Sequence, residues 1–172
     1  MEIYPALSAL LDRVTDLALL PWNLRGGTLI VRSEALRSLT ISYPAIAESA
    51  GKAELPVRIE RAPALERVRA ESVWPSEAAD LLAHLASDPN LPSTRAVEML
   101  ISGERSARWY PHPGSLGPVA ERVRLALEAA VGAEVAARWR VEVVREAAPN
   151  GRNEHAPRPL GIIRAERRAL LH

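Results

Sequence analysis

Two of the four histidines of this sequence, His112 and His155, are candidates for acid–base chemistry. His112 lies between two prolines, and His155 follows Glu154 in a long polar segment. A ribonuclease needs a general base and a general acid, such as an imidazole and a carboxyl group, together with cations that hold the phosphate. Arg152 and Arg158 could supply those cations if the two segments met in space. A small metal-independent nuclease is therefore our alternative hypothesis.

The sequence offers no pattern for a metal site. Metal binding needs three or four ligands at fixed spacing, and none of the HxH, HxxxH or HExxH patterns occurs. Cysteine is absent, which excludes thiolate ligands, disulfides and cysteine nucleophiles. We expect neither a metal nor another cofactor, and we favour a protein without enzymatic activity.

Arginines form a second group of candidate residues. Of the 22 basic residues only Lys52 is a lysine, and the basic excess lies in the second half of the chain, although the net charge is +1. A guanidinium group presents a planar fork to phosphate or carboxylate. We expect the candidate arginines to point outward, without carboxylate partners in the same molecule, and to hold nucleic acid or a protein neighbour. They are Arg95, Arg105, Arg108, Arg152, Arg158, Arg164, Arg167 and Arg168.

Residues 76–113 contain SEAADLL, then a break, then STRAVEMLISGE and finally RSARWYPHP. This order resembles the winged helix-turn-helix of excisionases and MerR-type regulators. The resemblance implies that the second helix reads DNA while arginines on the wing contact phosphates. The implied contacts are Ser93, Thr94, Arg95 and Glu98 on the helix, with Arg105 and Arg108 on the wing. The break is longer than the turn of that motif, and we favour two ordinary core helices with serine caps.

The elements that must position these residues follow from the hydrophobic pattern. Apolar residues at helical spacing predict helices over 6–20, 77–87, 94–102 and 118–132, with Ser76 and Ser93 as N-caps. Alternating or β-branched runs predict strands over 28–32, 39–43, 54–61, 138–146 and 160–168. Residues 33–38 could form a helical turn or a hairpin connection, and residues 64–74 are ambiguous between helix and strand.

We therefore predict an α+β fold in a single domain over residues 1–172. The strands and helices do not alternate as in a doubly wound sheet, which favours an antiparallel or mixed sheet of about 4–6 short strands, with helices mainly on one face. A strand pair, 138–147 and 160–168, is joined by the long loop 148–159. We find no internal repeat. Whether the loops 105–113 and 148–159 converge is left open by the sequence.

Composition supports a folded protein, because 48% of residues are hydrophobic and 25% are charged. No apolar run approaches the roughly 18 residues of a membrane span, so we expect a cytoplasmic protein without a membrane partner. Our leading hypothesis is a non-catalytic binding protein of bacterial or phage origin. It would be an accessory or assembly subunit that contacts nucleic acid or a larger protein complex through its arginines, and it could form a homo-oligomer.

Overall fold

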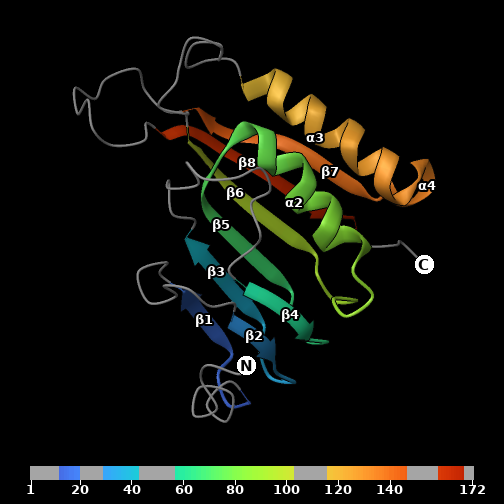
Figure 1. Ribbon diagram of the computed structural model, residues 1–172. Helices are drawn as coiled ribbons and strands as arrows, with labels where there is room; N and C mark the ends of the chain where they lie inside the picture. Colours follow the sequence, from blue (N-terminus) through green and yellow to red (C-terminus); the bar gives the residue numbers. More distant parts are fainter. Residues whose placement is uncertain (1–11, 20–28, 43–56, 103–115, 147–158, 169–172) are drawn as a thin grey trace.

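A mixed sheet of six strands is the centre of the fold (Figure 1). The computed structural model describes residues 12–19, 29–42, 57–102, 116–146 and 159–168. The strand order is β1-β3-β5-β6-β8-β7, and β2 pairs with β4 in a separate two-stranded sheet. The bounds are β1 Asp16–Leu19, β2 Leu29–Arg32, β3 Ser38–Ser42, β4 Val57–Arg61, β5 Arg67–Val73, β6 Ala96–Ser102, β7 Trp139–Glu146 and β8 Pro159–Arg167.

The two halves of the large sheet differ in strand direction. Strands β1, β3, β5 and β6 are parallel, whereas β8 is antiparallel to both of its neighbours, β6 and β7. Helices α2 (Pro75–Ser87) and α3 (Leu116–Val131) lie together on one face of this sheet (Figure 1), and the short helix α4 (Ala133–Ala136) follows α3. The mixed sheet with helices on one face confirms the predicted α+β class.

The parallel half is built from a repeated unit. From β1 to β5 the chain alternates between the sheets, with β1, β3 and β5 in the large sheet and β2 and β4 in the small sheet. Helix α2 then follows β5 at the point where this alternation would require another strand of the small sheet. Each return enters the large sheet through a similar turn, and the equivalent residues Leu65 and Thr94 are 29 positions apart. The expectation of no internal repeat is therefore wrong. The repeat is hard to see in the sequence because few residue identities are shared between the units.

Backbone hydrogen bonds stack these turns on one another. The amide of Arg37 donates to the carbonyl of Thr15 (2.8 Å), that of Glu66 to Arg37 (2.9 Å), and that of Arg95 to Glu66 (2.9 Å). The amide of Arg167 extends the series by donating to Arg95 (2.7 Å). The polar backbone of each turn is thereby satisfied by its neighbour, and successive strands begin at the same end of the sheet.

Alternation along the strands sends one face of the sheet into the core. Leu39, Val68 and Val97 occupy matching positions in β3, β5 and β6, and each is at most 1% exposed. Val31 of the small sheet belongs to the same buried cluster. Since side chains on a strand alternate between faces, the intervening residues of β3, β5 and β6 lie on the opposite face, which no described helix covers.

Helix α3 matches its prediction. Its buried residues, Leu116, Val119, Val123 and Leu127, recur every three or four positions and form one stripe. The helix ends before Gly132, whose φ of 83° belongs to a backbone region that favours glycine.

Helix α2 begins at Pro75 with Trp74 as its N-cap, so the predicted cap at Ser76 is misplaced. Proline suits a first helical turn because it lacks an amide hydrogen.

Two predicted helices are wrong where the structure describes them. Residues 16–19 of the predicted helix 6–20 form β1, and residues 96–102 of the predicted helix 94–102 form β6. In β6 the burial alternates, with Val97, Met99 and Ile101 buried and Glu98 half-buried. Pairing with β5 and β8 supplies backbone partners on both sides, and this outweighs the helix propensity of Ala, Glu, Met and Leu.

The other predicted strands are confirmed in their described parts: β2, β3, β4, β7 and β8. The ambiguous residues 64–74 contain β5. Residues 33–37 are not a hairpin connection, because β2 and β3 belong to different sheets. They form a turn in which the Ser33 hydroxyl oxygen accepts from the amides of Ala35 (3.3 Å) and Leu36 (3.1 Å).

None of the helices in the described residues has the length and apolarity of a membrane span.

Candidate functional site

The structure describes four of the predicted site residues: Arg95, Arg164, Arg167 and Arg168. They come from β6, β8 and the residues that adjoin them, and β6 and β8 are neighbours in the sheet. The remaining candidates lie outside the described residues. These are Arg105, Arg108, Arg152, Arg158, His112, His155 and Glu154. The convergence of their two segments, on which the nuclease hypothesis depends, therefore stays untested.

The predicted DNA-reading surface on residues 93–98 does not exist in the form that the resemblance implies. Residues 96–102 are a strand. The Thr94 side chain is 2% exposed, and its hydroxyl group donates to the carbonyl of Leu65 at 3.2 Å. Glu98 is held in ion pairs on the sheet. The described part of segment 76–113 consequently has no recognition helix, and the favoured pair of core helices is wrong for its second member.

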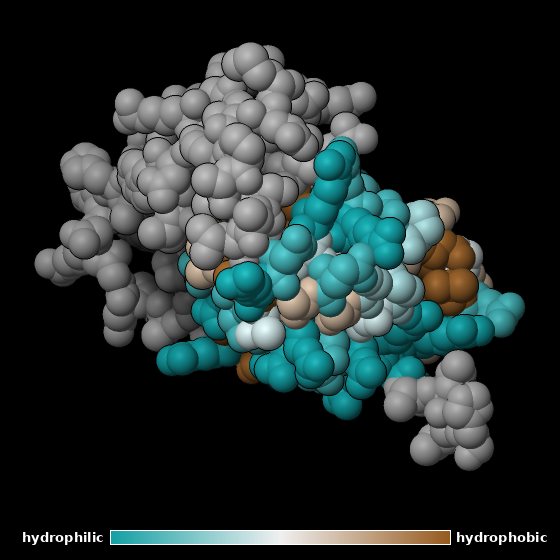
Figure 2. Space-filling view, turned by 90° about the horizontal axis from the view of Figure 1, so that it is seen from below, coloured by the Kyte–Doolittle hydropathy of each residue, from teal (hydrophilic) through white to brown (hydrophobic). Residues whose placement is uncertain are grey.

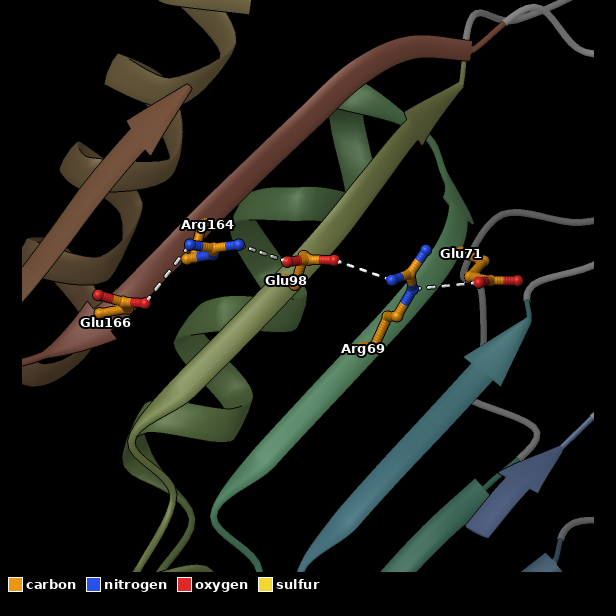
Figure 3. A network of polar contacts seen from close by, with 5 residues as sticks. All are labelled: Arg69, Glu71, Glu98, Arg164 and Glu166. Carbon is orange, nitrogen blue, oxygen red and sulfur yellow. Dashed lines mark hydrogen bonds and ion pairs between the residues drawn. The ribbon is translucent and has the colours of Figure 1, made fainter. Parts of the chain in front are cut away.

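The outward face of the sheet carries a network of arginines and glutamates (Figure 3). Glu98 of β6 lies between Arg69 of β5, at 3.1 Å, and Arg164 of β8, at 3.0 Å. Arg69 also pairs with Glu71 at 3.1 Å, and Arg164 contacts Glu166 at 3.8 Å. Partners from three adjacent strands thus neutralise one another across the sheet.

Arg164 departs from the expectation of outward-pointing, unpaired arginines. The hydrogen bond to Glu98 is the main cause that raises the pKa of Arg164 above its ordinary value, and the charge of Glu98 acts in the same direction, whereas partial desolvation opposes it. Its side chain is 35% exposed, so part of the guanidinium group still faces solvent. The carboxylates around it leave little net charge for an anionic partner, so we remove Arg164 from the anion-binding candidates.

A different set of arginines lies unpaired at the end of the sheet where the parallel strands begin. We call this set the basic rim. Each member is exposed, and none forms an ion pair with another described residue. The basic rim consists of Arg37, Arg67, Arg95, Arg167 and Arg168.

The stacked turns bring the basic rim together. Arg37 precedes β3, Arg67 opens β5, Arg95 precedes β6 and Arg167 closes β8, so four adjacent strands each contribute a cation at the same end. The guanidinium group of Arg167 donates to the carbonyl of Pro92 at 3.3 Å, which orients that side chain without neutralising it. Glu66 is interleaved between Arg37 and Arg95 along the hydrogen-bonded series.

Sequence reasoning found Arg95, Arg167 and Arg168 but missed Arg37 and Arg67. The signal that could have found them is the repeated turn, in which an apolar or threonine residue stands three positions before a buried strand residue. Leu36 precedes Leu39 in this way, Leu65 precedes Val68, and Thr94 precedes Val97. In each repeated turn an arginine stands one or two positions after this apolar or threonine residue, namely Arg37, Arg67 or Arg95.

The surface seen from below in Figure 2 is mainly hydrophilic where its residues are described, and apolar side chains form only small separate patches. The described residues contain no group of three or more His, Asp or Glu side chains that could hold a metal ion. On the face seen in Figure 2, hydrophilic side chains therefore cover most of the described surface.

Comparison with known proteins adds no assignment to this geometry. No protein-family model matches the chain, and neither a curated protein nor a solved structure is similar to it at a significant level.

Proposed function

We propose that this protein is a non-catalytic binding protein that holds nucleic acid by its phosphate backbone at the basic rim. The observation that carries the proposal is the row of unpaired, exposed arginines contributed by four adjacent strands. The open face a few residues away has the opposite character, since Arg69 and Arg164 are neutralised there by Glu71, Glu98 and Glu166. The rim therefore has an excess of cations that the open face lacks.

The dimensions of the basic rim suit a phosphate backbone. Strands in a sheet are about 4.8 Å apart, so Arg37 and Arg167, three strands from one another, are separated by roughly 14 Å of sheet. Duplex DNA carries one negative charge per about 1.7 Å of axis, so this length of rim faces several phosphates. Arginine is suited to the contact because its planar fork matches two phosphate oxygens at once.

The proposed binding is independent of base sequence. Trp139, which is the register partner of Arg167, is 7% exposed and therefore unable to stack on a base. Contacts to phosphates fix the position of a protein on nucleic acid without reading its sequence. We expect similar affinity for duplexes of unrelated sequence, and a strong dependence of affinity on salt.

The experiment measures fluorescence anisotropy of a short labelled DNA duplex with the wild-type protein over a series of salt concentrations. Each phosphate contact contributes about −0.9 to the slope of log K against log salt, so full engagement of the five arginines of the basic rim gives a slope of about −4.5. The double variant Arg95→Glu, Arg167→Glu should reduce the slope by about 2 and abolish binding at physiological salt.

The matched control is Arg122→Glu, Arg145→Glu, which changes the net charge equally but lies on α3 and β7, away from the basic rim. This control should keep most of the affinity. The proposal fails if the wild-type protein does not bind the duplex at low salt. It also fails if the two double variants lose affinity equally, because binding would then follow total charge and not the rim.

A further inference from the structure

The outward face of the large sheet has a charge order that makes it complementary to itself. Arg69, Glu98, Arg164 and Glu142 are successive register partners on β5, β6, β8 and β7. Their charges alternate in sign from one strand to the next. An alternating row with an even number of members becomes complementary to itself when its order is reversed, because each cation then faces a carboxylate.

The next row of the same face is apolar at its centre. Leu100 of β6 and Ile162 of β8 are register partners. Both are half-buried, and neither belongs to the hydrophobic core on the other face. On β7, Val144 lies at a bulge and is 42% exposed. The centre of the face thus combines an ion pair, Glu98–Arg164, with an adjacent apolar pair.

We propose that this face binds a second copy of the chain, face to face, about a two-fold axis that runs parallel to the strands between β6 and β8. Such an axis reverses the strand order but keeps each row opposite itself. Glu98 then faces Arg164 of the second copy, Arg69 faces Glu142 of the second copy, and Leu100 faces Ile162 of the second copy. The interface is isologous, so every contact occurs twice.

Other orientations of the same face are less favourable. A two-fold axis across the strands would place Arg69 over Arg69 and Glu98 over Glu98, which are repulsive pairs. In the proposed orientation the one like-charged pair is Arg67 with Arg140 of the second copy. Arg140 is exposed and also pairs with Glu142 at 2.8 Å. Solvent and salt screen a repulsion between two such exposed cations.

The size of the face predicts a weak dimer. The axis between β6 and β8 brings only β5, β6, β8 and β7 of each copy into contact. With strands about 4.8 Å apart and a rise of about 3.3 Å per residue, four strands of about five residues present on the order of 300 Å². Two copies would bury about 600 Å² in total, which is below the usual size of a stable specific interface. We therefore expect reversible association that depends on concentration. This inference concerns the outward sheet face and does not depend on the proposed function of the basic rim.

The test is a charge-swap experiment by sedimentation velocity over a concentration series. Arg164→Glu alone places Glu98 opposite a glutamate of the second copy, and Glu98→Arg alone places Arg164 opposite an arginine. Each variant by itself should therefore dimerise about tenfold or more weakly than wild type. An equimolar mixture of the two variants should form a heterodimer with close to wild-type affinity, because opposite charges face each other again.

The mixture separates association from folding. Each variant chain still lacks its internal Glu98–Arg164 pair in the mixture, so restored association cannot come from a repaired fold. Arg124→Glu is the control, since it disrupts an ion pair of α3, Arg124–Glu121, away from this face, and it should leave association unchanged. The proposal is overturned if the wild-type chain stays monomeric at millimolar concentration, or if the mixture does not associate more strongly than its components.

Discussion

Replacement of Leu65 by alanine tests the stacked turns on which the basic rim depends. Leu65 has no exposed surface and belongs to the hydrophobic core. It occupies the first position of the repeated turn, where the equivalent residues are Leu36 and Thr94. Its backbone carbonyl accepts the hydrogen bond from the Thr94 hydroxyl group, which joins two successive turns, and its side chain lies in the hydrophobic core.

The expected loss of stability is large compared with the stability of a domain. Buried Leu→Ala substitutions cost about 2–5 kcal/mol, which combines the lost transfer free energy with the cavity that remains. Because Leu65 is completely buried, we expect about 3 kcal/mol, out of a total unfolding free energy of about 5–15 kcal/mol. Leu125→Ala is the matched control, because Leu125 is 51% exposed; its cost should be below about 0.5 kcal/mol.

Urea denaturation followed by tryptophan fluorescence measures both variants. With a slope of about 2 kcal/mol per molar urea, Leu65→Ala should lower the midpoint by about 1.5 M, whereas Leu125→Ala should lower it by less than about 0.3 M. The comparison requires equal slopes and coincident transitions by circular dichroism. A loss below about 1 kcal/mol for Leu65→Ala, at an unchanged slope, would refute the packing of the turns described above.

Three further predictions concern helix α3 and the glycine that follows it. Gly132→Ala should destabilise the fold by about 1–3 kcal/mol, because a φ of +83° strains any residue with a Cβ. Gly117→Ala, in a helix with open space around the added carbon, should be neutral or stabilising by up to about 1 kcal/mol in the same thermal or urea unfolding assay. The hydrogen bond from Arg124 is the main cause that lowers the pKa of Glu121 below 4.5. The pairing of Glu121 with Arg124 therefore stabilises the fold above about pH 4.5. This contribution is lost as the pH falls through the lowered pKa of Glu121. Arg124→Gln should raise the pKa of Glu121 toward 4.5 in an NMR titration of its carboxyl carbon, and an unchanged pKa would contradict the pairing.

Local pattern was sufficient to predict several elements. Strands β7 and β8 and helix α3 were identified because each has a clear alternation or a clear stripe of apolar residues. The pattern of β6 was misread, since Ala96, Glu98, Met99 and Leu100 favour helix when their neighbours are unknown. The strand forms because β5 and β8 satisfy its backbone on both sides, and that pairing connects residues far apart in the sequence.

The candidate sites depended more strongly on long-range packing. The arginine content of the chain made anion binding a reasonable hypothesis, but composition does not distinguish Arg164 from Arg167. Register decides the difference, because Arg164 lies opposite Glu98, whereas Arg167 lies at the strand end beside Arg95. Arg37 and Arg67 join the basic rim only because successive units stack, which the sequence showed too weakly for us to recognise.

The sequence alone determined the α+β class, most strands, the main helix and the abundance of guanidinium groups, since these follow from hydrophobic periodicity and residue type. Tertiary structure decided which of those groups are neutralised and which remain available to a partner. The physical reason is that the strength of an ion pair depends on distance, and the distances between strands are set by hydrogen-bonded register and not by separation along the chain.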